Sequence, residues 1–314
     1  MSKGLVRTIL RGFSPKRLLN SVPAMLSSQS KLDWGKFTIA YATLLSCVIG
    51  FFVAGQDWRR RYAILKVPHV TVGVVAFENG DVASTNRLIE VLRSERSFDV
   101  RSVRPVVIRS GALREYDVLV FPGGVARQQG EALGAEGRDA VREFLRRGGG
   151  YVGICAGAFL AISGNVEALG VIDARSLSGD REIPGWGAVS FSARRSGVVD
   201  LQLSSVGREG LEGVPEVIPV HYSGGPILVP AGRQDLPDYV TWATFRNEVW
   251  SFEFQRGTMI DTPAIIAGRF GKGRVIAISP HPEATRALDF LVKRTVAIAA
   301  SDCEKDQVFG KVAM

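Results

Sequence analysis

The chain has 314 residues, of which 46% are hydrophobic, so it is long enough for one large domain or two modest ones with a sizeable core. Its formal net charge of +8 at pH 7 is concentrated in residues 1–66, which hold 11 lysines and arginines against two acids. The remaining chain carries 28 basic and 29 acidic residues, and this near-neutral balance argues against a nucleic-acid partner.

Residues 37–55 (FTIAYATLLSCVIGFFVAG) contain no charge. As an α-helix this segment would span about 28 Å, close to the hydrocarbon thickness of a bilayer. Trp34 and Trp58 flank it as interfacial aromatic residues do, so we predict a single-pass transmembrane helix or signal anchor that makes the membrane a partner. A cleaved signal ending near Gly55 and an organellar presequence in residues 1–30 remain alternatives. Basic residues on both sides leave the orientation open.

We therefore divide the chain into five segments. A basic N-terminal tail (1–36) precedes the transmembrane helix (37–55), and a basic linker (56–68) leads into a domain of residues 69–300. A short polar tail (301–314) ends the chain.

Strands and helices alternate in the first half of the domain. Continuous apolar runs predict buried strands at residues 70–77, 118–121 and 151–154. Apolar residues at helical spacing predict helices at 84–95, with Ser84 as the candidate N-cap, at 138–147 and at 156–162. This order predicts a doubly wound parallel sheet with reactive groups at the carboxyl ends of its strands.

Between about residues 185 and 258 the pattern changes to shorter segments that predict antiparallel strands, namely AVSFSA, LQLSSV, VTWATF and VWSFEF. Strands at 264–270 and 274–279 and a helix at about 283–300 complete the domain. The predicted fold class is α/β, a doubly wound parallel sheet with an added antiparallel β region, plus one N-terminal transmembrane helix.

Cys155 follows the strand at 151–154 and precedes a predicted helix, between Gly153 and Gly157. A cysteine on such a turn projects into the cleft, and the helix N-terminus behind it offers backbone N–H groups that favour a thiolate and an oxyanion. A small buried hydrophobe is the alternative. The three cysteines have neither metal-ligand nor disulfide spacing, so we expect no metal and no cofactor.

His281 and Glu283 follow the last predicted strand. In an extended chain, residues two apart point the same way, so Glu283 can orient the imidazole of His281. An oriented base beside a thiol is the arrangement that nucleophilic catalysis requires. A loop histidine and a first-turn helix acid are the alternatives. Gly123 and Gly124 end the strand at 118–121, and their backbone N–H groups are candidates for an oxyanion hole.

Four motifs occur in the order seen in class I glutamine amidotransferase-like domains, and the chain most resembles the domain at the N-terminus of biotin–protein ligases. They are Phe121-Pro-Gly-Gly124, Gly153-Ile-Cys-Ala-Gly157, His221-Tyr-Ser-Gly-Gly225, and Gly271-Lys-Gly-Arg274 with His281-Pro-Glu283. The resemblance implies a flavodoxin-like fold over about residues 69–298. It also implies Cys155 as nucleophile, His281 as base, Glu283 as orienting acid, and Gly124 and Ala156 as oxyanion donors.

Two features depart from the family. Working glutaminases usually carry a glutamine where this chain has Phe159, and no synthase or biotin-ligase domain follows. An amidotransferase would therefore need an acceptor or synthase partner protein. His221 and Tyr222 are candidates for the rim of a substrate pocket, and a glycine-rich hairpin turn is the alternative.

The sequence thus predicts a membrane-tethered, cysteine-dependent hydrolase or amidotransferase that acts on a small-molecule or peptide amide. A catalytically inactive binding or regulatory module of the same fold is one alternative. A cysteine peptidase or deglycase of the same superfamily is the other.

Overall fold

The computed structural model describes residues 69–78, 80–164, 167–177, 179–183, 187–191, 196–249, 256–301 and 306–309. The predicted basic tail, transmembrane helix and linker (1–68) lie outside these residues, as does most of the predicted C-terminal tail. Among the helices that the structure describes, none has the length and apolar composition needed to cross a bilayer.

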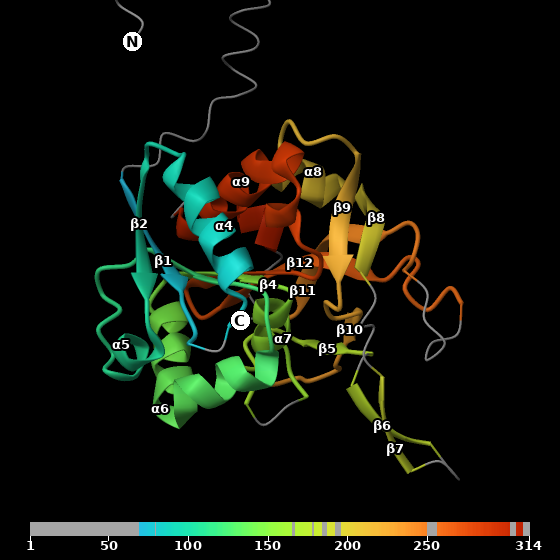
Figure 1. Ribbon diagram of the computed structural model, residues 1–314, viewed down its shortest axis with the longest axis horizontal. Helices are drawn as coiled ribbons and strands as arrows, with labels where there is room; N and C mark the ends of the chain where they lie inside the picture. The colour runs from blue at the N-terminus through green and yellow to red at the C-terminus, as the bar shows by residue number, and fades with distance from the viewer. Residues whose placement is uncertain are drawn as a thin grey trace, which may run out of the picture. The chain divides into compact units, whose positions relative to one another are not determined.

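The described domain is built on one mixed sheet of nine strands (Figure 1). Its first half is parallel, in the order β2 (Phe98–Val103), β1 (Val70–Val75), β3 (Val118–Phe121), β4 (Gly150–Ile154) and β13 (Gly273–Ile278). The antiparallel half continues from β13 through β12 (Pro263–Phe270), β11 (Tyr239–Phe245), β8 (Ser196–Leu203) and β9 (Val217–Ser223).

Two small antiparallel pairs lie outside this sheet. They are β5 (Ala174–Ser176) with β10 (Leu228–Pro230), and β6 (Gly179–Ile183) with β7 (Gly187–Phe191).

Helices cover both faces of the sheet. In Figure 1, α4 (Val82–Arg93) and α9 (Asp289–Ala300) lie on one side, whereas α6 (Ala126–Arg146) and α7 (Ala156–Ala161) lie on the other. Two short helices, α5 (Pro105–Arg109) and α8 (Ser205–Gly210), and three 3-10 turns complete the described structure. The turns are η1 (Pro282–Ala284), η2 (Arg286–Leu288) and η3 (Asp306–Phe309).

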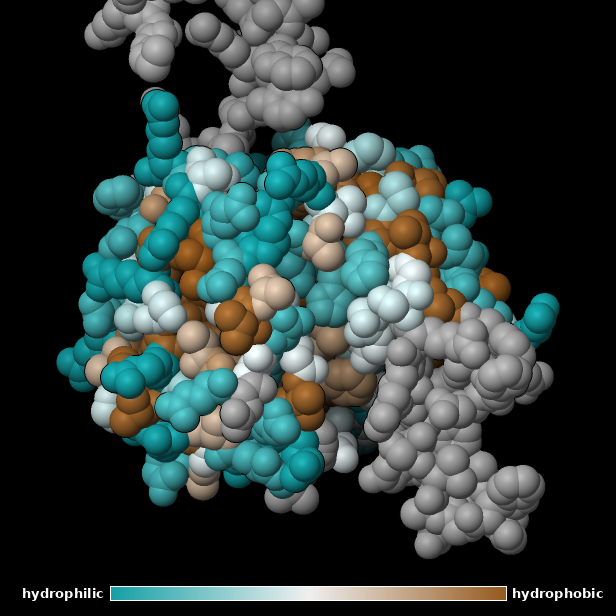
Figure 2. Space-filling model, in the orientation of Figure 1, coloured by the Kyte–Doolittle hydropathy of each residue, from teal (hydrophilic) through white to brown (hydrophobic). Residues whose placement is uncertain are grey.

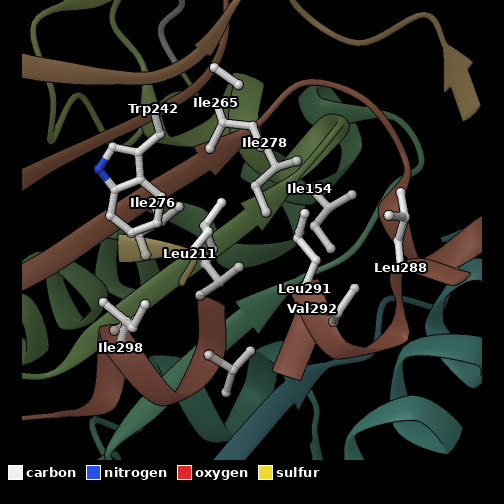
Figure 3. Close-up of a cluster of buried hydrophobic side chains, with 14 of the residues drawn as sticks. Ile154, Leu211, Trp242, Ile265, Ile276, Ile278, Leu288, Leu291, Val292 and Ile298 are labelled. Carbon is white, nitrogen blue, oxygen red and sulfur yellow. The ribbon is translucent and has the colours of Figure 1, made fainter. Parts of the chain in front are cut away.

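Each face of the sheet has its own hydrophobic cluster. The α4–α9 face packs Leu291 and Val292 of α9 toward Ile154 of β4 and Ile278 of β13 (Figure 3). The other face packs α5, α6 and α7 against alternate residues of the same strands. Because strands β3 and β4 are buried along their whole length, they appear in the sequence as continuous apolar runs.

The predicted fold class is wrong about the arrangement of the sheet. The sheet is mixed, and its antiparallel strands extend the parallel ones in the same sheet instead of being added to a wholly parallel one. The expected transmembrane helix at 37–55 falls outside the described residues, and the described helices include no candidate for it.

Several element boundaries also differ from the prediction. Helix α4 begins at Val82, since Asp81 caps it by accepting from the Ser84 backbone N–H at 2.9 Å. Helix α6 starts twelve residues before the predicted 138, because Gly134 (φ 65°) joins two helical pieces across a kink. The last predicted helix is two 3-10 turns followed by α9. The sequence did not predict strands β2, β5, β6, β9 and β10 or helices α5 and α8.

Candidate active site

Cys155 lies at a sharp turn between β4 and α7. Its backbone has φ 51° and ψ −101°, a left-handed conformation that costs a non-glycine residue about 1–3 kcal/mol. The surrounding backbones approach closely: a Cβ at Gly153 would stand 2.3 Å from the Gly157 carbonyl oxygen, and one at Gly157 would stand 2.3 Å from the Phe121 oxygen. Both glycines are therefore required for this turn. The Sγ of Cys155 donates to the Ser223 carbonyl at 3.5 Å.

His281 and Glu283 follow the end of β13 and line the same pocket as Cys155. The His281 Nδ1 lies 2.7 Å from the Glu283 Oε1, and both side chains are buried. A carboxylate only accepts hydrogen bonds, so Nδ1 is the donor and Nε2 is the ring nitrogen left for Cys155. Burial alone would lower the pKa of His281, but hydrogen bonds and charge from Cys155 and Glu283 raise it from 6.5 to about 10.

The three side chains line a pocket of about 440 Å³. Gly124, in the loop after β3, and Ser223, the last residue of β9, form part of its wall. Gly124 has φ 132°, which only glycine adopts readily. Gly123 is buried directly against His281, with room for no Cβ, since that atom would stand 2.7 Å from Cε1.

Ala156, His221 and Tyr222 were also predicted as site residues, and of these three only His221 lines the pocket. Ala156 is buried as the first residue of α7, next to Cys155. His221 lines the pocket, and its Nε2 lies 3.2 Å from the Ser196 Oγ. Tyr222 points the other way into the core, where its hydroxyl donates to the Gly225 carbonyl at 2.7 Å. Tyr222 thus supports the turn instead of lining the pocket.

The N-terminal part of α4 supplies pocket residues that the sequence did not indicate, namely the N-cap Asp81 and the helix residues Ala83, Ser84 and Arg87. Ser84 donates its hydroxyl to the Glu283 Oε1 at 2.9 Å, and Arg87 donates from Nε to the Glu283 carbonyl at 3.2 Å. Their spacing of three residues places them on one helix face, but that signal alone does not single out a site. In the described part of the chain, no three His, Cys, Asp or Glu side chains are grouped as metal ligands.

The comparisons with known proteins agree with this architecture. The family model described as biotin-protein ligase, N terminal, matches residues 74–307. No curated protein matches the sequence. A ThuA-like protein from Bacteroides uniformis shares the fold, with a TM-score of 0.50 and 13% identity over 78% of this chain and 97% of that chain. PurLQS from Thermotoga maritima gives a TM-score of 0.48 and 16% identity over 73% of this chain and 95% of that one.

Proposed function

Because the chain belongs to the biotin–protein ligase N-terminal family and has a glutamine amidotransferase-like fold, we propose that it is a cysteine-dependent amide hydrolase or amidotransferase. Cys155 is the nucleophile, His281 the proton-transfer group and Glu283 the acid that orients it. The observation that carries this proposal is that Cys155, His281 and Glu283 line one pocket, with His281 Nδ1 held 2.7 Å from the Glu283 Oε1.

In the first half of the reaction, His281 already holds the thiol proton on Nε2, because its pKa of about 10 keeps the imidazole protonated at pH 7. The Cys155 sulfur then attacks the carbonyl carbon of the amide. The carbonyl oxygen becomes an oxyanion, for which backbone N–H groups of Gly124 and Ala156 are the proposed donors. The C–N bond then breaks, the leaving nitrogen takes the proton from His281, and a thioester remains on Cys155.

In the second half, His281 takes a proton from water as the water oxygen attacks the thioester carbon. The C–S bond breaks, the carboxylic acid leaves, and the sulfur recovers its proton from His281. Glu283 stabilises the imidazolium that forms in each half and keeps Nδ1 as the donor. In an amidotransferase the released ammonia would pass to an acceptor on a partner protein.

One residue outside the pocket argues against free glutamine as the substrate. Phe159, where working glutaminases carry a glutamine, packs against the hydrophobic cluster of α6 and α7. The residues that line the pocket are mainly polar, among them Asp81, Arg87 and His221. The face seen in Figure 2 is likewise mainly hydrophilic, with small apolar patches.

The proposal is tested by alkylating the full-length protein at pH 7 and quantifying each cysteine by peptide mass spectrometry. Cys155 is expected to react at least tenfold faster than Cys303, and His281→Ala is expected to abolish this advantage. His69→Ala is the matched control, since His69 is exposed and outside the pocket.

Ammonia release from a panel of primary amides, compared with Cys155→Ser, then tests the catalytic activity. A Cys155 that reacts no faster than Cys303, together with no ammonia release, would instead favour a binding module of the same fold.

A further inference from the structure

We propose that Ser84 is a positioning residue of this site, whose hydroxyl holds the Glu283 carboxylate in the orientation that His281 requires. This inference rests on the proposed function, and it adds helix α4 to the elements that hold the three proposed catalytic residues in place.

Both side-chain hydrogen bonds of the Glu283 carboxylate fall on the same oxygen. Oε1 accepts from His281 Nδ1 at 2.7 Å and from the Ser84 hydroxyl at 2.9 Å. Oε2 is buried and has no hydrogen-bond partner among the described residues. Ser84 is thus the contact outside the triad that fixes the rotation of the carboxylate about its terminal bond.

A buried carboxylate needs such a partner. Glu283 is 1% exposed, and an ionised carboxylate out of water is destabilised unless hydrogen bonds replace its hydration. Without Ser84, Oε1 would keep only His281, and the carboxylate could turn to present either oxygen. The imidazole would then lose the fixed acceptor that defines its tautomer and its plane.

Helix α4 is held firmly enough to act as a support. Asp81 caps its first turn by accepting from the Ser84 N–H, and Arg87, one turn later, donates to the Glu283 carbonyl. Arg87 is itself paired with Asp289 at 2.6 Å. The helix therefore contacts Glu283 at two points, the side chain through Ser84 and the main chain through Arg87.

The test compares Ser84→Ala with Ser84→Thr, which keeps the hydroxyl, and with Thr85→Ala as a matched control. Thr85 is the next residue of the same helix, but its hydroxyl donates to the Asp81 carbonyl and it does not line the pocket. We expect the alkylation rate of Cys155 at pH 7 to fall at least fivefold in Ser84→Ala alone. Equal losses in the alanine and threonine variants would overturn the proposal.

A double-mutant cycle separates positioning from a general structural effect. In a Glu283→Gln background the further change Ser84→Ala should have less than a twofold effect, because the carboxylate that Ser84 orients is gone. An undiminished loss in that background would show that Ser84 acts elsewhere, and the proposal would be wrong.

A nuclear magnetic resonance measurement keeps this test distinct from the test of the proposed function. The Nδ1 proton of His281 is expected to be protected from exchange with water in the wild type and to exchange at least tenfold faster in Ser84→Ala. This holds even if Cys155 proves unreactive. An unchanged exchange rate would overturn the role of Ser84 while leaving the function of Cys155 untouched.

Discussion

The imidazole of His281 packs directly on the backbone of Gly123. A Cβ at Gly123 would stand 2.7 Å from Cε1 and 3.4 Å from Nδ1 of that ring. The glycine after Pro122 therefore does more than form a turn: its missing side chain makes the space in which the ring lies between Cys155 and Glu283.

Replacing Gly123 by alanine should displace His281 and slow alkylation of Cys155 at pH 7 at least tenfold. Gly197→Ala is the matched control, because its nearest contact is the half-buried side chain of Val249 at 3.1 Å and not a residue of the pocket. Thermal unfolding would be measured on both variants to show that they fold. A Gly123→Ala protein with wild-type alkylation would mean that the ring position is not critical.

The raised pKa of His281 predicts a specific pH dependence of stability. A folded-state pKa of about 10 lies above the ordinary value of 6.5, so protonated His281 stabilises the fold fully below pH 6.5. That contribution is lost as the pH rises through about 10. The difference in unfolding free energy between wild type and His281→Gln should therefore shrink between pH 6.5 and 10, as measured by urea denaturation.

Two controls define the origin of this effect. His69→Gln removes an exposed histidine and should give a difference that stays flat across the same window. In a Cys155→Ala background the decrease should be smaller, since Cys155 supplies part of the interaction that raises the pKa. A difference that grows with pH would contradict the assignment.

The parts of the fold that could be predicted are those with an unambiguous pattern. Strands β3 and β4 are buried on both faces, and their apolar runs are continuous. Strand β9 alternates, with Ile218, Val220 and Tyr222 buried and the residues between them less so. The sequence did not indicate which set faces the core, so His221 and Tyr222 were treated alike although they point to opposite sides.

The site illustrates the same limit. The spacing of His281 and Glu283 predicts that the two residues interact when the chain between them is extended. In the structure Pro282 starts a 3-10 turn, and that turn brings the two side chains together. Ser84 was interpreted as a helix cap because serine is common there. Its tertiary partner Glu283, 199 residues away, could not be inferred from local pattern.

Gln129 holds the loop of residues 122–124, which follows β3. It is 1% exposed, and its Nε2 donates to the Pro122 carbonyl at 2.9 Å. Gln129→Leu should leave that buried carbonyl unsatisfied and cost about 1–3 kcal/mol of unfolding free energy, measured by urea denaturation. The exposed neighbour provides the control, since Gln128→Leu should change stability by less than about 0.5 kcal/mol. Equal effects of the two variants would argue that the loop is held by other contacts.

Tyr151 supports the turn that carries Cys155. Tyr151 lies near the start of β4 and is wholly buried. Its hydroxyl donates to the carbonyl of Gly157, two residues after Cys155, at 2.7 Å. Tyr151→Phe removes this donor while keeping the ring that stacks on Phe121 at 4.8 Å. We expect a loss of about 1–3 kcal/mol in unfolding free energy and slower alkylation of Cys155, because the turn relaxes. Tyr239→Phe, at a half-buried tyrosine outside the pocket, should leave alkylation unchanged. If Tyr151→Phe lowered stability but left alkylation at the wild-type rate, the hydroxyl would stabilise the fold without shaping the turn.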